Sequence, residues 1–277
     1  EHRIMAAIQS EFLESERLQR HIRFLYSHGS LYRSYNHNLL FHGGVPLNKD
    51  GSFKEIYLNG KPYKGKAFMD MVDFIARQAY DKRDTNSLDY MWYMWCGIDS
   101  PVSGRIVKTF ERSYIVDQST WKEPQNDYYH LNRDRDECIK ILHEFGIDSP
   151  QGHIINGHVP VRTLKGESPI KADGRLLVID GGFCKAYQQT TGIAGYTLIY
   201  NSACYRLVSH EPFVGRAEAI RTSQDIASTS VVFERLESRL KIAGTDVGRQ
   251  LQEQIDDLMA LLLAYRSGAI AEDHKEY

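Results

Sequence analysis

Two histidines carry the clearest chemical signal in this sequence. His42 ends a short apolar run and is followed by Gly43 and Gly44, and His158 follows Gly157 just after a second apolar run. Neutral imidazole is a common ligand of Mn, Fe and Zn. Glycine has no Cβ atom and lets a ligand approach the backbone closely. We therefore predict that the two histidines are halves of one metal site.

A structural explanation competes with this prediction. A lone histidine at the end of a strand is commonly half-buried, with its ring nitrogens hydrogen-bonded to backbone carbonyl groups. The chemical explanation depends on the pair, because α/β proteins place their functional groups at the carboxyl ends of neighbouring strands. If His42 and His158 end adjacent strands, they meet at one edge of a sheet.

Three apolar runs are the predicted strands that position these residues. One ends at His42 and a second leads into His158. The third, over residues 175–179, is apolar almost throughout and ends in Asp180 and two glycines. A continuous apolar run is typical of a strand that is buried on both faces.

The spacing of apolar residues predicts the helices around these strands. One long helix is expected over residues 3–28, and others over 66–80 and 135–145. Asp-Gly and Asn-Gly dipeptides within residues 48–65 indicate a small hairpin or turns. Aromatic side chains are concentrated in residues 88–97, where they either pack a core or form the wall of a pocket.

The carboxyl-terminal part differs in character. Residues 196–208 are expected to form a β-hairpin, while residues 231–242 and 247–265 are expected to form an antiparallel pair of helices. Such a pair would pack against the body of the protein or against a partner subunit. We predict a core domain over residues 1–215 and a helical appendage over residues 216–277.

Composition limits the possible partners and compartments. The formal net charge is −2, from 34 Lys and Arg and 36 Asp and Glu, so nothing favours nucleic acid or an anionic membrane as a partner. Four widely spaced cysteines form no Cys-x-x-Cys pair, and no window is long and apolar enough to span a membrane. We expect a cytoplasmic protein with a small or specific partner.

The order of these motifs resembles the carboxyl-terminal half of the calcineurin-like metallophosphoesterases. The shared pattern is His-Gly-Gly at His42, an aromatic segment followed by a Gly-Arg loop, Gly-His at His158, and a strand ending Ile-Asp-Gly-Gly. Within that superfamily, residues 92–101 and 156–161 are similar to the class III fructose-1,6-bisphosphatase of many bacteria, the Firmicutes type. The resemblance covers most of the chain.

The resemblance implies a fold and a set of site residues. The fold is α/β (α+β), half of a metallophosphoesterase-like sandwich, with a mixed sheet flanked by helices and a carboxyl-terminal helical pair. His42 and His158 are implied as ligands of a dinuclear Mn²⁺ site, Arg105 as a phosphate contact, and Asp180 as a carboxylate that orients a ligating histidine. Arg105 could instead be a solvated loop cation, and Asp180 could serve only to fix its turn.

The sequence departs from the superfamily in one major respect. It lacks the Asp-x-His, Gly-Asp-x-x-Asp-Arg and Gly-Asn-His-Asp/Glu motifs, which supply most metal ligands, the bridging aspartate and the catalytic histidine. We therefore expect this chain to be the carboxyl-terminal part of a longer phosphatase. Its metal site should be incomplete, its catalytic residues cannot be assigned, and the fragment alone should be inactive.

For the whole protein, the resemblance implies hydrolysis of a small sugar bisphosphate, fructose 1,6-bisphosphate, in gluconeogenesis. A homo-oligomer is expected. Two alternatives stay open. One is another calcineurin-like phosphatase that acts on proteins or dinucleotides, which should lack the Trp95-Cys96-Gly97 context. The other is a non-catalytic regulatory or dimerisation module, to which the carboxyl-terminal helices would contribute.

Overall fold

The computed structural model describes residues 1–180, 183–223 and 228–271. The chain divides into two compact units, Glu1–Asp180 and Gly181–Tyr277, and each is described by itself. The domain boundary predicted between residues 215 and 216 stays a prediction. Within the described residues, no helix combines the length and the apolar character that crossing a membrane requires.

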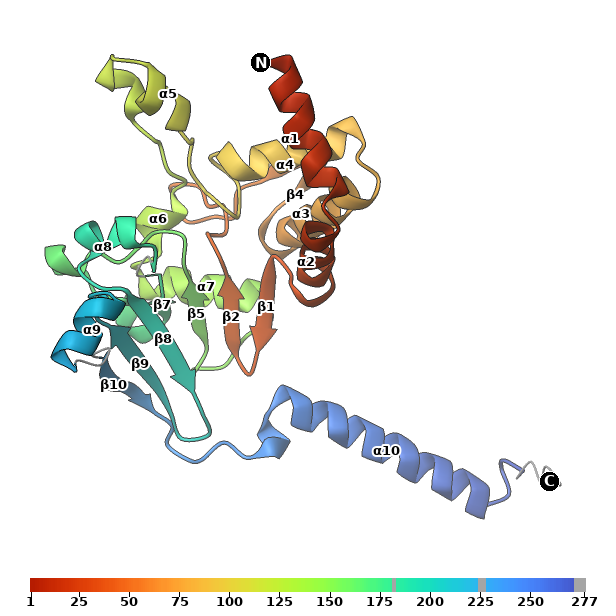
Figure 1. The fold of residues 1–277 in the computed structure, drawn as a ribbon. Helices are drawn as coiled ribbons and strands as arrows, with labels where there is room; N and C mark the ends of the chain where they lie inside the picture. Colours follow the sequence, from red (N-terminus) through yellow and green to blue (C-terminus); the bar gives the residue numbers. More distant parts are fainter. Residues whose placement is uncertain (181–182, 224–227, 272–277) are drawn as a thin grey trace. The chain divides into compact units, whose positions relative to one another are not determined.

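A five-stranded mixed sheet forms the centre of the first unit (Figure 1). Its strands, in spatial order, are β1 (Tyr32–Tyr35), β2 (Asn38–Phe41), β5 (His153–Asn156), β7 (Leu176–Val178) and β6 (Ile170–Lys171). β2, β5 and β7 run parallel, whereas β1 and β6 pair with their neighbours antiparallel. This arrangement confirms the predicted α/β fold with a mixed sheet.

The outer strand β1 has no counterpart among the sequence predictions. It joins β2 through a two-residue turn, in which Asn36 has φ 46° and His37 has φ 66°. Two positive φ values in a two-residue hairpin loop are typical of a type I′ turn, and Asn and His tolerate this region better than most residues. β1 is mostly exposed and therefore lacks the apolar pattern that marks the inner strands.

Helices surround the sheet of the first unit. They are α1 (His2–Glu14), α2 (Glu16–His28), α3 (Gly65–Asp81), α4 (Thr85–Cys96), α5 (Thr109–Tyr114), α6 (Tyr128–Leu131) and α7 (Arg135–Glu144), with the short 3₁₀ turns η1 (Gln118–Trp121), η2 (Thr163–Lys165) and η3 (Ala172–Gly174). The helices predicted over 66–80 and 135–145 correspond to α3 and α7. The predicted small hairpin is β3 (Ile56–Leu58) with β4 (Lys61–Tyr63), which turns at Asn59 and Gly60.

The single helix predicted over residues 3–28 is wrong, because the chain breaks at Ser15. Ser15 is extended, with ψ 96°, and its hydroxyl oxygen accepts a hydrogen bond from the Leu18 amide at 3.4 Å. A serine hydroxyl can accept a hydrogen bond from one of the free amides in the first turn of a helix. Ser15 therefore starts α2 instead of continuing α1. The apolar spacing runs through this break, which is why periodicity alone did not show it.

The aromatic segment is a helix, α4, that only partly enters a core. Met94 is 7% exposed, whereas Trp92 is 60% exposed and Trp95 is 46% exposed. The two tryptophan rings contact each other edge to face, with ring centroids 5.0 Å apart. The sequence suggested that residues 88–97 either pack a core or form the wall of a pocket. Core packing applies to Met94 but not to Trp92 and Trp95.

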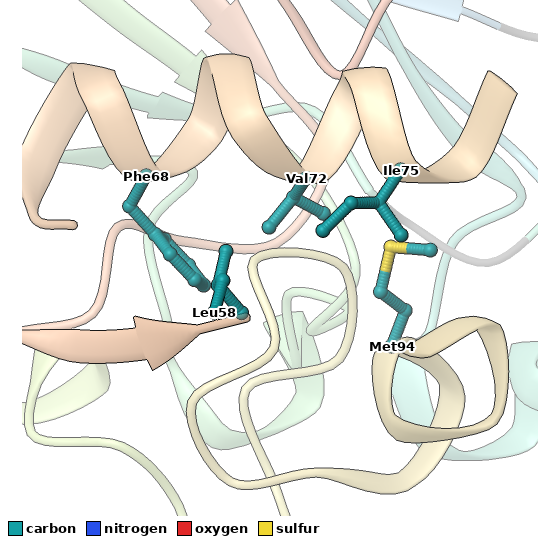
Figure 2. Close-up of a cluster of buried hydrophobic side chains, with 5 residues drawn as sticks. All are labelled: Leu58, Phe68, Val72, Ile75 and Met94. Carbon is teal, nitrogen blue, oxygen red and sulfur yellow. The ribbon is translucent and has the colours of Figure 1, made fainter. Parts of the chain in front are cut away.

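A compact apolar cluster joins α3, α4 and the β3–β4 hairpin. Phe68, Val72 and Ile75 lie on one face of α3 and pack against Leu58 and Met94 (Figure 2). Their spacing of four and three residues is that of a helix with one buried face. This cluster holds α4 against α3, and the loop that carries Arg105 follows α4 in the chain.

We expect Phe68→Ala to lower the free energy of unfolding of this chain by about 3–5 kcal/mol, because it removes a buried ring and leaves a cavity. Phe68 is 1% exposed. Phe74→Ala is the matched control on the same helix, since Phe74 is 52% exposed, and it should cost less than about 1 kcal/mol. Urea unfolding of both variants measures the difference. Equal losses would show that the cluster does not stabilise the unit.

The second unit contains an antiparallel sheet and one long helix. The sheet is ordered β10 (Ser228–Arg235), β9 (Cys204–His210) and β8 (Gly195–Tyr200), and β8 with β9 forms the predicted hairpin. The helices are α8 (Lys185–Thr191), α9 (Arg216–Thr222), the 3₁₀ turn η4 (Ile242–Gly244) and α10 (Asp246–Arg266).

The helix predicted over residues 231–242 is wrong, because this stretch begins inside strand β10. Val231 and Val232 pair with β9, and the register shifts between Val232 and Glu234. Two β-branched residues followed by Phe233 suit a pleated strand better than a helix, and pairing with a neighbouring strand decided the outcome. The carboxyl-terminal part therefore has a single long helix, α10, in place of the predicted pair.

Candidate functional site

The candidate site lies at the carboxyl ends of the three parallel strands. β2, β5 and β7 are in register, so the residues that follow them reach the same edge of the sheet. The Gly157 amide donates a hydrogen bond to the His42 carbonyl oxygen at 2.9 Å, which joins the ends of β2 and β5. The Ile179 amide donates to the Asn156 carbonyl oxygen at 3.0 Å and extends this link to β7. Three strand ends therefore bring His42, His158 and Asp180 together.

The rings of His42 and His158 meet edge to face, with one nitrogen of each ring close to the other. The Nε2 atom of His42 lies 3.2 Å from the Nδ1 atom of His158, and the ring planes are inclined at 74°. This distance suits a hydrogen bond between two imidazoles. It also suits two nitrogens on one ion, since metal–nitrogen bonds of about 2.0–2.1 Å at a right angle separate the nitrogens by about 3 Å. The structure thus pairs the two predicted residues, and their role as metal ligands stays a prediction.

A third histidine shows what the competing structural explanation looks like. His153, in β5, is 1% exposed and its Nδ1 atom lies 2.8 Å from the Gly174 carbonyl oxygen. Its ring is held inside the protein by a backbone group. His42 and His158 differ, because each has a ring nitrogen directed at the other ring.

His158 occupies an uncommon backbone conformation. Its φ is 64°, in the left-handed region, and the Val159 amide donates a hydrogen bond to the Gly157 carbonyl oxygen at 2.8 Å. A non-glycine residue held in this region costs on the order of 1–3 kcal/mol. The turn redirects the chain at the end of β5 and points the imidazole towards His42.

The glycines after His42 serve protein packing and not ligand access, which corrects their interpretation from the sequence. A Cβ atom on Gly43 would lie 2.4 Å from the Val102 carbonyl oxygen, and one on Gly44 would lie 2.4 Å from the Tyr128 ring. The Gly44 amide also donates to the Pro101 carbonyl oxygen at 3.1 Å. The two glycines are therefore needed because the 101–105 loop and Tyr128 pack directly against the backbone.

Gly157 is the glycine that leaves space beside the histidines. A Cβ atom there would lie 3.7 Å from His42 Nδ1 and 3.8 Å from Asp180 Oδ2. No atom blocks this position, and its nearest neighbours are polar groups of the candidate site.

A buried polar network fixes the strand ends from behind. The Asn156 side-chain amide donates to the Gly43 carbonyl oxygen at 3.2 Å and to the Tyr128 hydroxyl at 2.7 Å. Tyr128 is 1% exposed, and burial raises the pKa of its hydroxyl well above the usual value. Asn126 accepts hydrogen bonds from the amides of Leu47 and Tyr128. The sequence analysis did not identify Asn126 or Tyr128, because their segment carries no periodic signal. It also did not identify a role for the Asn156 side chain, because its partners come from distant segments.

Arg105 lies close to the histidine pair in a partly buried position. Its side chain is 23% exposed and its guanidinium lies 3.5 Å from the Glu123 carboxylate. Burial lowers the pKa of His158 and the charge of Arg105 adds to this shift, whereas burial raises the pKa of Tyr129 to about 12 and the charge of Arg105 opposes it. Arg105 therefore lies near both groups. Arg105 is therefore not the freely solvated cation of the competing explanation. Its contact with a phosphate stays a prediction.

Asp180 combines a structural contact with a position at the site. Its backbone carbonyl oxygen accepts a hydrogen bond from the Val161 amide at 2.8 Å, which fixes the turn. Its carboxylate lies beside Gly157, and its charge partly opposes the lowering of the His158 pKa that burial causes. Gly181 and Gly182, which complete this sequence motif, lie outside the described residues.

Burial lowers the pKa of His158 to about 4, and the nearby charge of Arg105 and the His42 ring act in the same direction. Asp180 and the Ser103 backbone oppose this shift. The Nε2 atom of His158 is buried and meets no partner at hydrogen-bonding geometry among the described residues. The ring is thus neutral at neutral pH, which is the form that binds metals.

The described residues do not complete a metal site. Across residues 1–180, 183–223 and 228–271, no group of three or more His, Cys, Asp or Glu side chains is placed to hold an ion. The pair offers a metal two imidazole nitrogens at a suitable separation.

We expect the His158 ring in the metal-free chain to titrate near pH 4, whereas a histidine in the unfolded chain titrates near about 6.5. Between these values the unfolded state binds the additional proton. The free energy of unfolding should therefore fall as the pH drops from about 6.5 to 4, and the contribution of His158 should be constant above this window. NMR titration after chelator treatment tests this, and a midpoint near 6.5 would contradict the burial of the ring.

These features define an α/β protein with a histidine pair at adjacent parallel strand ends, and comparison with known proteins gives its family. Residues 1–267 match the model of the Firmicute fructose-1,6-bisphosphatase family. The chain belongs to this family.

Individual relatives extend the comparison across almost the whole chain. It is 51% identical over 278 residues to a protein of Clostridium acetobutylicum named fructose-1,6-bisphosphatase class 3. It is 50% identical over 281 residues to a protein of that name from Clostridium botulinum strain Langeland. Each match covers at least 98% of this chain and 42% of the relative. The chain therefore spans about two fifths of the length of these relatives. No solved structure shows a significant match.

Proposed function

We propose that this chain is the carboxyl-terminal part of a fructose-1,6-bisphosphatase that hydrolyses fructose 1,6-bisphosphate to fructose 6-phosphate and phosphate. The observation that carries the proposal is the pairing of His42 and His158 at 3.2 Å in a chain about half identical to proteins with that name. With this reaction we propose a role for the whole protein in gluconeogenesis and a cytoplasmic location. The four free cysteines agree with a reducing compartment.

We propose that His42 and His158 supply two nitrogen ligands to a dinuclear Mn²⁺ centre of the calcineurin-like metallophosphoesterase type. The neutral state of His158 and the separation of the two nitrogens support this role. When bound, such a centre orients the phosphoryl group and provides an activated water. The remaining ligands would come from the part of the whole protein that this chain does not contain.

Other residues of the chain would then act on the phosphoryl group or on its surroundings. Arg105 is always charged and partly buried, so it can offset charge that develops on phosphoryl oxygens. Asp180 lies where its carboxylate can orient an imidazole. Gly157 lies between His42 and Asp180, where a Cβ atom would make only ordinary van der Waals contacts with both residues.

An assay of the whole protein beside the isolated chain tests the proposal. With Mn²⁺ and fructose 1,6-bisphosphate, the whole protein should release phosphate, and the isolated chain should not. A phosphopeptide and a dinucleotide polyphosphate serve as competing substrates. Preferred hydrolysis of either would assign the protein to another phosphatase activity, and robust turnover by the isolated chain would refute the need for ligands from outside it.

A further inference from the structure

Residues 104–126 form an arm of the first unit whose two ends lie side by side. The Asn126 amide donates a hydrogen bond to the Gly104 carbonyl oxygen at 2.9 Å, which closes the arm. Helix α5 and the turn η1 lie between these ends (Figure 1). The closed arm brings the side chain of Glu123 to Arg105, although the two residues are 18 positions apart in the sequence.

The Glu123 carboxylate is held at both of its oxygens. Its Oε1 atom accepts a hydrogen bond from the Lys108 amide at 3.1 Å. Its Oε2 atom lies 3.5 Å from the guanidinium of Arg105 and 3.5 Å from that of Arg112. The Glu123 side chain is 15% exposed, so solvent screens these ion pairs only in part. One fixed carboxylate therefore lies between two cations that would repel each other without it.

The contact with Glu123 orients Arg105 and leaves it able to bind another anion. A distance of 3.5 Å is longer than a charge-assisted hydrogen bond of about 2.7–2.9 Å. The Nε atom of Arg105 is buried and meets no hydrogen-bond partner among the described residues. The loop before Arg105 is itself fixed against the backbone that follows His42, through the hydrogen bond between the Gly44 amide and the Pro101 carbonyl oxygen.

We propose that Glu123 is a positioning residue, which holds the Arg105 guanidinium beside the histidine pair so that it meets an anion bound there. The inference rests on the proposed function in taking this anion to be the phosphoryl group of a substrate. A charge that is already in place stabilises a transition state without rearranging during the reaction. Glu123 acts on the phosphoryl group only through Arg105.

A purely structural role for Glu123 competes with this proposal, because the carboxylate also closes the arm through the Lys108 amide. Glu123→Gln separates the two roles, since it keeps an oxygen for this amide and removes the negative charge. In the whole protein it should lower kcat for fructose 1,6-bisphosphate by about 10- to 100-fold, because a misplaced Arg105 stabilises the transition state less well. KM and bound metal should change little.

Glu111→Gln is the matched control in the same arm. The Glu111 carboxylate contacts the Lys108 ammonium group at 2.6 Å, and its side chain is 25% exposed. The substitution makes the same chemical change at a carboxylate paired with a different cation, and it should leave kcat unchanged. An unchanged or increased kcat in Glu123→Gln would overturn the proposal.

A double-mutant cycle shows whether Glu123 acts through Arg105. Arg105→Gln should lower kcat by about 100-fold or more, because it removes the charge at the phosphoryl group. Adding Glu123→Gln to this variant should then cause no further loss. If the two losses multiply, Glu123 acts independently of Arg105 and the proposal is refuted.

NMR of the isolated chain tests the positioning without any activity. The Nε–H signal of Arg105 is assigned by its loss in Arg105→Gln. Glu123→Gln should shift this signal and speed its exchange with solvent, whereas Glu111→Gln should leave it in place. An Arg105 signal that Glu123→Gln does not alter would show that the carboxylate does not hold the guanidinium. A whole protein that fails to hydrolyse fructose 1,6-bisphosphate would instead refute the proposed function, and this signal would then decide the positioning by itself.

Discussion

Replacing His158 with Asn in the whole protein is expected to lower kcat/KM for fructose 1,6-bisphosphate by at least about 100-fold and to reduce bound metal. Loss of a hydrogen bond to a metal ligand already costs about 10–100-fold in affinity or activity, and loss of the ligand itself should cost more. Asn is the suitable replacement because it tolerates the left-handed backbone that His158 adopts at φ 64°. Steady-state kinetics and metal analysis give the two readouts.

His37→Asn is the matched control for this experiment. His37 has almost the same backbone conformation, with φ 66°, but it lies in the β1–β2 turn at the opposite end of β2. This variant should keep its metal and its activity. If His158→Asn also kept both, His158 would not be a ligand, and the proposed centre would have to be built without it.

Gly44→Ala is expected to destabilise the isolated chain by about 3 kcal/mol or more, at the upper end of the usual overpacking range. The added methyl carbon would lie 2.4 Å from the Tyr128 ring. That ring is buried and its hydroxyl is held by Asn156 at 2.7 Å, so it cannot move aside without breaking the network. Urea unfolding measures the loss.

Gly157→Ala provides the comparison, since its methyl carbon would have no neighbour closer than 3.7 Å. It should change the free energy of unfolding by less than about 1 kcal/mol. If Gly44→Ala were as mild as Gly157→Ala, the close packing of Tyr128 against the His-Gly-Gly backbone would be disproved.

The strand ends of the candidate site could be predicted from the sequence because two local signals agree there. Buried parallel strands need apolar residues on both faces, and glycines at the end of an apolar run indicate where a strand ends. Both signals are present around His42 and His158. That the two ends are adjacent followed only from the resemblance and the general rule for α/β sheets, and the register of β2 with β5 shows it directly.

The supporting residues could not be predicted, because their roles depend on distant contacts. The Asn126 side chain accepts a hydrogen bond from the amide of Leu47, 79 positions away in the sequence. The Asn156 side chain donates a hydrogen bond to the hydroxyl of Tyr128, 28 positions away. No pattern in the neighbouring sequence encodes such pairs. The glycines of His-Gly-Gly were misinterpreted for the same reason, since the loop and ring that press against them come from other segments.

The errors in secondary structure occur where hydrogen-bond partners, local or distant, override the preference that the apolar spacing indicates. At Ser15 the apolar period favours one helix, but the serine hydroxyl caps a new one. In residues 231–235 a helical spacing is present, but the β-branched pair finds a strand partner in β9. Periodicity records which side chains are apolar and not which backbone groups find partners.

The imidazole pair also has a consequence for metal selectivity. Two nitrogen donors bind divalent ions in the Irving–Williams order, in which manganese is the weakest of the first-row series and copper the strongest. Taken alone, the 3.2 Å pair of His42 and His158 would therefore favour copper, nickel or zinc over manganese. If the whole protein uses manganese, its preference has to come from oxygen donors added to this pair and from the supply of metal in the cell.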